Sequence, residues 1–250
     1  MMTVTSWPIA EPGPLREPTV WRIDLTLDEI WRHACLAALS EDERARAARF
    51  LRLEDRDRYA ASHAALRHIL AGALGTDPGL LRFRSGAAGK PELDGPWRDR
   101  LAFNLSHSGR IGLIGLSPAG RIGVDVELTR PLSDCLGLAR SHFSRAEIAA
   151  LEAQPPADRQ AAFYACWTRK EAFVKALGAG LSFPLNRFVV AVPPEPAALV
   201  SLDGSAQAAR GWSLQHLDPA PDHVGAVAIQ GEGPACLLRS LDADWSTNLA

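Results

Sequence analysis

The sequence is poor in cysteine, and its cysteines are not spaced as pairs. The 250 residues include four of them, Cys35, Cys135, Cys166 and Cys236, which lie far apart along the chain. Structural zinc sites, redox dithiols and disulfide frameworks rely on characteristic cysteine spacings. The sequence therefore argues against these classes and favours reduced thiols in a cytoplasmic protein.

Long apolar runs and a strong net charge are also missing. No stretch approaches the ~18 consecutive apolar residues that indicate a membrane-spanning helix. Residues 1–18 contain four prolines and no apolar run preceded by basic residues, so they do not resemble a signal peptide. The net charge of −2 gives no general attraction to nucleic acid or to an anionic membrane. We expect neither as a partner, and any anionic ligand must be bound by a local patch.

The composition that is present, 47% hydrophobic and 22% charged, is typical of a globular protein. A proline-rich arm, expected to be loose, covers residues 1–18, and Thr19–Leu25 is β-rich. Ser40 and Glu43 have the spacing of a capping box, which predicts a helical stretch to about Leu74. We expect a break in this stretch near residues 54–57. Further strands are predicted at 81–84, 101–105 and 110–116.

The order of strand, helices and strands then occurs a second time. Arg121–Leu128 alternates with period two, as a half-buried strand does. Helices are predicted at 134–139, 144–153 and 157–177, and strands at 187–192, 212–217 and 224–229. We therefore expect an α+β fold of two similar halves, residues 19–118 and 119–250, each with a small antiparallel sheet packed against helices. A functional site would lie between them.

Asp125 and Glu127 are the first candidate site residues. Residues two apart in a strand point to the same face, so both carboxylates project together, while Val124 and Val126 face the other way. Adjacent carboxylates repel each other unless a cation lies between them, and a hard divalent cation is the usual partner. The pattern also fits a solvent-facing edge strand, which by itself is the more common explanation.

Glu171 and Lys175 lie four residues apart on the last predicted helix and therefore share one face. A plain surface ion pair is the alternative explanation for them. Lys170 falls close to the middle of the apolar stripe of the same helix, where an unpaired ammonium is costly. It must reach solvent or find a carboxylate or carbonyl partner, and a charge that breaks the pattern is more typical of a site than of a surface.

Two polar segments of the first half are candidates for binding an anion. Ser106 and His107 lie in a predicted polar turn between two apolar runs and can donate hydrogen bonds to a phosphate. A structural hairpin explains them equally well. Lys90 lies in the glycine-rich loop 85–91, which lacks the length and ending of a Walker loop.

An arginine series runs along the predicted helical stretch of the first half, interleaved with acidic residues. A solvated helix face explains most of these arginines. One or two of them could still reach a nucleotide phosphate.

The order of these motifs is more specific than any one of them. Lys-Pro in a glycine loop, then FNLSHSG, IGVDVE and WTRKEAFVKALGAGLSFPL, resembles the phosphopantetheinyl transferase superfamily. The length resembles the long single-chain type, which is similar to two fused halves of the small trimeric type and includes activators of surfactin-like peptide synthetases. The resemblance covers roughly Ser40 to Val190. It implies two halves related by a pseudo-two-fold axis and a monomer.

The resemblance also implies an activity, namely transfer of the phosphopantetheine arm of coenzyme A to a serine of an apo acyl or peptidyl carrier protein. Asp125, Glu127 and Glu171 would be ligands of Mg²⁺, with Mn²⁺ able to replace it. Glu171 and Lys175 would be the catalytic residues, with Glu171 taking the proton of the carrier serine directly or through a metal-bound water. Contacts to coenzyme A would come from Arg46, Arg58, Lys90, Ser106, His107 and Lys175. Glu43 stands where the long type often has another basic residue.

Two other functions remain open at this point. One is a different metal-dependent phosphoryl enzyme, such as a phosphatase or nuclease, which would act without a carrier protein. The other is a module that binds coenzyme A or a nucleotide without catalysis. Three carboxylates beside an anion argue against the second, because binding alone does not need them.

Overall fold

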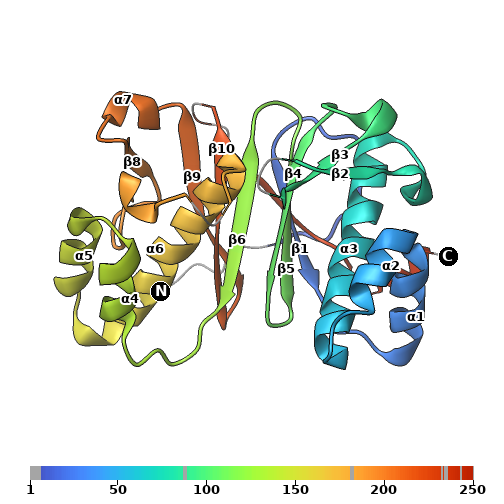
Figure 1. Cartoon of the computed structure of the whole chain (residues 1–250), viewed down its shortest axis with the longest axis horizontal. Helices are drawn as coiled ribbons and strands as arrows, with labels where there is room; N and C mark the ends of the chain where they lie inside the picture. Colours follow the sequence, from blue (N-terminus) through green and yellow to red (C-terminus); the bar gives the residue numbers. More distant parts are fainter. Residues whose placement is uncertain are drawn as a thin grey trace.

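The structure of the protein is a computed structural model that describes residues 7–86, 89–180, 183–231, 233, 236–242 and 244–249. It has an α+β fold of two similar halves side by side, with strands in the middle and helices on the outer flanks (Figure 1). This confirms the predicted fold class. None of the helices in these residues is long and apolar enough to cross a membrane. The expected cytoplasmic location stays a prediction.

In its described residues, the first half contains five strands and three α-helices, with two short 3-10 helices. Their bounds are β1 (Thr19–Asp24), α1 (Glu29–Ala38), α2 (Glu41–Ala47), α3 (Leu53–Leu74), η1 (Pro78–Leu80), β2 (Phe83–Ser85), β3 (Pro91–Leu93), η3 (Gly95–Trp97), β4 (Ala102–Ser108) and β5 (Ile111–Ser117).

The rest of the chain repeats this order and then adds a final strand and a 3-10 helix. The bounds are β6 (Ile122–Leu128), α4 (Cys135–His142), α5 (Arg145–Glu152), α6 (Pro156–Leu177), η4 (Leu185–Arg187), β7 (Phe188–Val190), β8 (Leu199–Leu202), α7 (Ala206–Ala209), β9 (Trp212–Ala220), β10 (His223–Gln230), β11 (Leu237–Ser240) and η5 (Trp245–Leu249).

The two main sheets have the same antiparallel core. Their strand orders are β1-β5-β4 and β6-β10-β9, so in each half the first strand pairs with the last hairpin. The first sheet gains a fourth strand, because β11 returns from the end of the chain and pairs in parallel with β1. An apolar cluster that includes Val20 and Ile111 on one side and Val124 and Val126 on the other fills the space between the sheets. It brings β4 and β6 together.

A capping box begins α2, as the sequence predicts. Ser40 Oγ accepts from the N–H of Glu43, and the Glu43 carboxylate accepts from the N–H of Ser40 at 2.8 Å. The same carboxylate accepts from Arg67 Nε at 2.7 Å, and Arg67 is buried in α3. Glu43 therefore has a structural role, joining α2 to α3.

The second half repeats this device. Ser144 and Glu147 form the capping box of α5, and Glu147 Oε1 accepts from Lys170 Nζ at 2.6 Å. Lys170 also donates to the Phe188 carbonyl at 2.8 Å, and its side chain is 0% exposed. Lys170 therefore has both of the expected kinds of partner, a carboxylate and a backbone carbonyl. These contacts join α6 to α5 and β7, and they do not include the candidate site residues.

The break in the helical stretch lies at residues 48–52, between α2 and α3, and the prediction of residues 54–57 was wrong. Glu54 and Asp55 lie in the first turn of α3, where negative charge interacts favourably with the helix dipole. The acidic cluster therefore begins a helix. Helix α1 was not predicted from the sequence.

Ser106 and His107 lie in β4, and their prediction as turn residues was wrong. Strands β4 and β5 form a hairpin whose loop is only Gly109 and Arg110. Gly109 has a φ of 55°, a conformation that glycine adopts readily and that tight hairpin loops require. The strand therefore extends through Ser108.

The described part of the proline-rich arm is packed, so the expectation of a loose arm was wrong for residues 7–18. Trp7 Nε1 donates to the Asp218 carbonyl at 3.1 Å, and Ile9 forms a bridge with Ser240 of β11. Pro12 lies on Gly72 of α3 so closely that a Cβ there would come within 2.6 Å of it. Residues 1–6 lie outside the described part of the chain.

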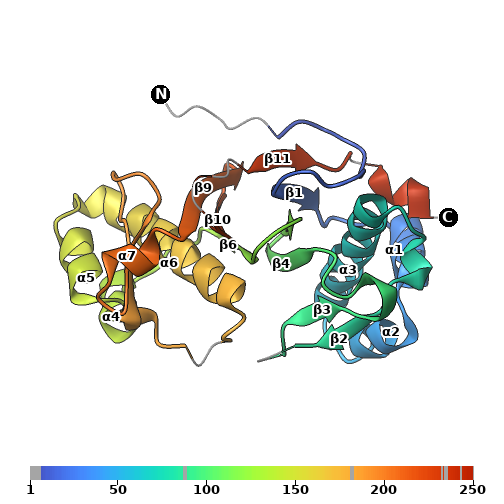
Figure 2. The same ribbon diagram turned by 90° about the horizontal axis from the view of Figure 1, so that it is seen from above.

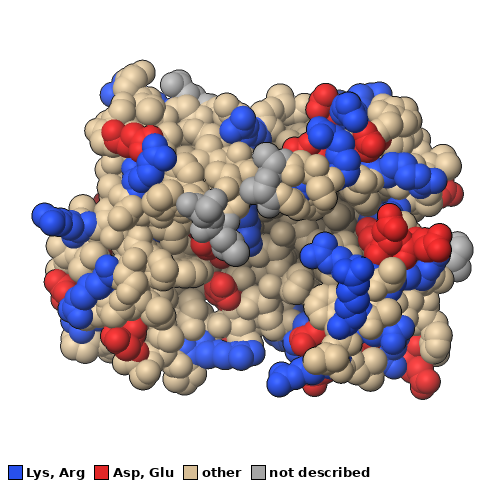
Figure 3. Space-filling model, viewed as in Figure 1, with Lys and Arg blue, Asp and Glu red and all other residues tan. Residues whose placement is uncertain are grey.

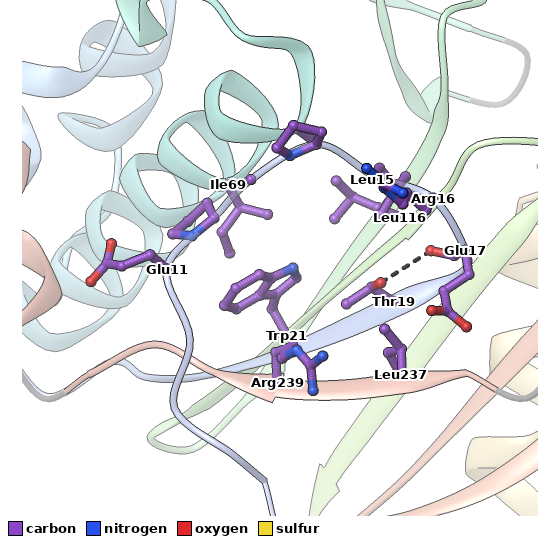
Figure 4. Close-up of a pocket in the computed structure, with 14 residues that line it drawn as sticks. Glu11, Leu15, Arg16, Glu17, Thr19, Trp21, Ile69, Leu116, Leu237 and Arg239 are labelled. Carbon is purple, nitrogen blue, oxygen red and sulfur yellow. Dashed lines mark hydrogen bonds between the residues drawn. The ribbon is translucent and has the colours of Figure 1, made fainter.

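A pocket of about 240 Å³ lies beneath the arm, against α3, β1 and β11 (Figure 4). Trp21, Ile69 and Leu116 form its apolar floor, and Arg16 and Arg239 lie at its margin. Seen from above, the arm and β11 run along one side of the molecule, while α6 and the β2–β3 hairpin flank the opposite side (Figure 2).

Candidate functional site

The predicted alternation in β6 sets the position of the two carboxylates. Val124 and Val126 are buried in the cluster between the sheets, and Asp125 points to the other face, where its carboxylate meets Lys175 of α6. A Cβ on Gly123 would lie 2.1 Å from the Ala172 carbonyl of α6, so the glycine permits the close approach of this helix to β6. Asp125 is only 3% exposed, which excludes a solvent-facing strand edge at this position.

Both halves of the chain contribute to the surroundings of Asp125. Lys175 Nζ donates to Asp125 Oδ1 at 2.6 Å and to Ser106 Oγ of β4 at 2.9 Å. Ser106 Oγ in turn donates to the same Oδ1 at 3.1 Å. Asp125 Oδ2 is buried and has no hydrogen-bond partner among the described residues. Burial raises the pKa of Asp125, and the charge of Lys175 opposes that shift.

Glu127 and Glu171 have raised pKa values in the same electrostatic neighbourhood. Burial is the main cause of the raised pKa of Glu127, and the charge of Asp125 raises this pKa further. Burial also raises the pKa of Glu171, with a further contribution from Asp125, while Lys175 opposes it. Ser108 Oγ donates to Glu127 Oε2 at 3.1 Å. The carboxylates therefore repel one another around a single ammonium group, an arrangement that an additional cation would stabilise.

Within the described residues, no group of three His, Cys, Asp or Glu side chains is gathered closely enough to hold a metal ion. The ammonium group of Lys175 lies against Asp125 instead. The donor set nevertheless fits a hard divalent cation in its chemistry, because it consists of carboxylate oxygens and includes the buried, unpartnered Oδ2 of Asp125.

A pocket of about 210 Å³ between the halves brings Lys90 together with Glu171 and Lys175. Figure 3 shows a hollow between the halves with acidic and basic side chains at its margin. Lys90 Nζ donates to the Lys175 carbonyl at 2.7 Å and to the Ile122 carbonyl at 3.2 Å. Burial lowers the pKa of Lys90 to about 8, and Arg121 adds to this effect. Ala87 and Ala88 of the glycine loop, and Leu181 and Ser182 after α6, lie outside the described residues.

His107 lies near the basic groups of Lys175 and Arg58 and near the acidic Asp55. Partial burial is the main cause of the lowered pKa of His107, and the charges of Lys175 and Arg58 lower it further. Arg58 itself forms ion pairs of 3.3 Å with Glu54 and Asp55.

The other arginine of the predicted contact set, Arg46, lies over the ring of Tyr59, 5.8 Å from its centre. Tyr59 stacks on His63 with 3.8 Å between the ring centres. Burial lowers the pKa of His63, and the charge of His107 adds a smaller contribution. These residues therefore extend from α2 and α3 towards His107 on the first-half side of the site.

Sequence reasoning missed Asn104 and Ser108. They flank Ser106 at intervals of two residues in β4, and both bond to β6. The signal was present as alternating polar residues in NLSHS, but the assignment of this segment to a turn concealed it.

Comparison with known proteins gives two family matches along this chain. Residues 27–118 match the family described as 4'-phosphopantetheinyl transferase, N-terminal, and residues 121–228 match the 4'-phosphopantetheinyl transferase superfamily.

Individual relatives agree with these matches. 4'-phosphopantetheinyl transferase HetI of Nostoc is 39% identical over 218 residues, which cover 87% of this chain and 89% of that protein. 4'-phosphopantetheinyl transferase Sfp of Bacillus subtilis is 31% identical over 183 residues, 73% of this chain and 80% of that protein. The chain belongs to the 4'-phosphopantetheinyl transferase superfamily and is a transferase of the long, Sfp-like type.

Proposed function

We propose that this protein transfers the 4'-phosphopantetheine arm of coenzyme A to a serine of an apo acyl or peptidyl carrier protein. The serine oxygen forms a bond to the phosphorus that carries the pantetheine arm. The bond from this phosphorus to the bridging oxygen of the diphosphate breaks, and adenosine 3',5'-bisphosphate leaves. The observation that best supports the proposal is the meeting of Asp125, Lys175 and Ser106 between the two halves, within the electrostatic reach of Glu127 and Glu171.

Asp125, Glu127 and Glu171 are the residues that would hold Mg²⁺, or Mn²⁺ in its place. Two observations support this assignment, namely that the buried Oδ2 of Asp125 has no hydrogen-bond partner among the described residues and that the carboxylates repel one another. When bound, the ion supplies charge neutralisation and polarisation of the phosphoryl group.

Glu171 is the proposed base that takes the proton of the carrier serine. Its raised pKa gives the carboxylate a stronger affinity for a proton than an ordinary glutamate has. It lines the pocket between the halves, where the serine can reach it.

Lys175 and Lys90 would hold the diphosphate, and His107 and Ser106 the nucleotide end with its 3'-phosphate. Lys175 reaches this role by exchanging its bond to Asp125 for a phosphate oxygen, a similar charge-assisted bond. Arg46 and Arg58 would add positive charge on the side of α2 and α3.

The carrier protein would approach the hollow between the halves. Basic side chains at its margin (Figure 3) would attract an acidic carrier. We further propose that the protein acts as a monomer, because both halves of the site belong to one chain.

Intact-mass spectrometry tests this function. The protein is incubated with coenzyme A, Mg²⁺ and a panel of apo-carriers, and we expect the carrier to gain the mass of one phosphopantetheine arm. A reaction without carrier serves as the control for a phosphatase or nuclease. Phosphate release or nucleic-acid cleavage in that control, with no mass gain by any carrier, would contradict the proposal.

A further inference from the structure

The site lies where the edges of two separate sheets face each other. Strand β4 is the edge of the first sheet and β6 is the edge of the second. An edge strand presents backbone N–H and C=O groups that need partners. In this protein, side chains of β4 provide such partners to β6.

Three polar residues of β4, namely Asn104, Ser106 and Ser108, form a row on one face, because they are two residues apart. We call them the polar row. Asn104 Oδ1 accepts from the backbone N–H of Val124 at 2.8 Å. Ser106 bonds to the carboxylate of Asp125. The polar row therefore crosses from the first half to both the backbone and the carboxylates of the second.

Ser108 both donates and accepts a hydrogen bond through its hydroxyl, as Ser106 does. Its hydroxyl donates to Glu127 Oε2 at 3.1 Å and accepts from the backbone N–H of Leu128 at 3.1 Å. Because a hydroxyl has one proton, the bond from Leu128 leaves that proton directed at Glu127. The orientation of the hydroxyl is thereby set.

The backbone of Ser108 is held from the second half. His223 of β10 is 4% exposed, and its Nε2 donates to the Ser108 carbonyl at 3.0 Å. A Cβ at the neighbouring Gly109 would come to 3.0 Å from the same nitrogen, so the glycine leaves room for this bond. Ser108 is thus bound through its side chain and its backbone, and Glu127 receives its bond from a fixed group.

We propose that Ser108 is a positioning residue for Glu127, which holds this carboxylate ready to bind the divalent cation. The proposal rests on the proposed function, since it assigns Ser108 a part in the same site. Groups that bond to metal ligands set their orientation, and loss of such a group typically weakens metal binding about ten- to a hundredfold. A residue of the first half would then orient a carboxylate of a metal site whose proposed ligands all belong to the second half.

The alternative is that Ser108 only satisfies the exposed N–H of Leu128 and so stabilises the fold. The two roles differ in what they affect. A stabilising role changes the melting temperature, while a positioning role changes the affinity for the ion in protein that is fully folded.

The test measures binding of Mn²⁺ to the full chain in the presence of coenzyme A, by electron paramagnetic resonance of the free ion. We expect Ser108→Ala to weaken Mn²⁺ binding by about tenfold, which corresponds to ~1.4 kcal/mol. The Mg²⁺ concentration for half-maximal transfer should rise by a similar factor, with a smaller change in kcat. Ser108→Thr keeps the hydroxyl and should bind Mn²⁺ within about threefold of the unaltered chain.

Ser117→Ala is the matched control. Ser117 is a buried serine of the adjacent strand β5, and its hydroxyl donates to the Ala119 carbonyl, away from β6. We expect it to leave Mn²⁺ binding unchanged. If Ser108→Ala binds Mn²⁺ as the unaltered chain does, or if Ser117→Ala loses affinity equally, the positioning role is overturned.

A double-mutant cycle keeps the test valid if Ser108→Ala folds poorly. Ser108→Cys, which replaces the hydroxyl with a weakly donating thiol, is combined with Glu127→Gln, and Mn²⁺ binding is compared with that of the two single variants. If Ser108 acts through Glu127, changes at Ser108 add no loss once Glu127 is altered. Additive losses overturn the proposal. A chain that transfers no arm but shows this coupling would refute the proposed function and leave the positioning role standing.

Discussion

The two halves share one architecture but differ in what they place on the face between the first strand and the long helix. In the second half, β6 directs Asp125 towards Lys175 of α6. In the first half, β1 directs Trp21 and Ile23 into the apolar core against α3. The same arrangement of elements thus holds a polar site in one half and ordinary core in the other.

The helices can be compared position by position. Arg67 is the fifteenth residue of the 22 in α3, and Lys170 is the fifteenth of the 22 in α6. Each is bound by the glutamate of the preceding capping box. On this alignment, Glu171 corresponds to His68, and Lys175 corresponds to Gly72.

The first-half counterpart of the site is covered. Pro12 of the arm lies on Gly72, and the ring of His68 lies 6.3 Å from that of Trp245 in η5. The pocket beneath the arm (Figure 4) occupies the neighbouring space. The ends of the chain therefore cover the face that in the second half remains open to ligand.

The largest expected effect comes from altering the two corresponding helix positions, Glu171 and His68. We expect Glu171→Gln to lower the rate of transfer by about a thousandfold, because it removes the proposed base, while much of the affinity for coenzyme A remains. His68→Gln should keep the rate within about twofold of the unaltered chain. Rates come from intact-mass measurements of the carrier, and affinity comes from calorimetry.

Equal losses of rate and affinity in Glu171→Gln would contradict its role as the base. A large loss of rate in His68→Gln would contradict the assignment of chemistry to one half only.

The second test compares the two buried cations. Lys170→Met leaves Glu147 buried with 0% side-chain exposure, and breaking such a pair costs about 3–5 kcal/mol of unfolding free energy. Arg67→Met should cost less, because the carboxylate of Glu43 is 12% exposed and can reach water. Denaturation in urea measures both.

The double variant Lys170→Met with Glu147→Gln should recover part of the stability, since no uncompensated charge remains. If the double variant loses as much unfolding free energy as Lys170→Met, the loss of stability comes from packing rather than from the uncompensated charge.

The sequence pattern of the second half predicts its candidate site residues, but it does not predict the distant partner of Lys170. The faces of β6 and α6 follow from local periodicity, so the candidates Asp125, Glu127, Glu171 and Lys175 could be chosen without a structure. The partner of Lys170 could not, because Glu147 lies 23 residues away and meets it only after α5 packs on α6. Local patterns do not specify such contacts.

Contacts between distant strands were also beyond prediction. The pairing of β11 with β1 joins segments more than 200 residues apart. The contact of Ser108 with Glu127 depends on how the edges of two sheets meet, and no periodicity of either strand describes that. Long-range contacts of this kind also place the arm and η5 over Gly72 and His68 of α3.

The third test adds one methyl group at a close approach to the long helix in each half. In Gly123→Ala the new Cβ meets the backbone of α6 and must displace the helix that carries Glu171. We expect a loss of about 1–3 kcal/mol in unfolding free energy, together with reduced transfer. In Gly72→Ala the new Cβ meets Pro12 of the arm. We expect a smaller loss of stability and unchanged transfer, and a matching loss of activity in both would contradict the idea that the arm only covers.

The smallest expected effect concerns Lys90, the residue through which the first half holds the end of α6. Its pKa is lowered to about 8 by burial, so it loses its charge as the pH rises through 8. We expect the KM for coenzyme A to rise by about 1.5- to fivefold above that pH, since a screened charge contributes ~0.2–1 kcal/mol. Lys90→Arg keeps its charge and should remove this rise.

Stability should change in the opposite direction. A lysine whose pKa is lower in the folded chain than the ordinary 10.5 binds fewer protons there than in the unfolded chain between about pH 8 and 10.5. The contribution of Lys90 to the free energy of unfolding therefore increases with pH over this window, and weaker binding of coenzyme A there cannot be attributed to unfolding through Lys90. If the KM rises equally in Lys90→Arg, a different group is responsible for the pH dependence. The role of Lys90 would then be limited to its hydrogen bond to the end of α6.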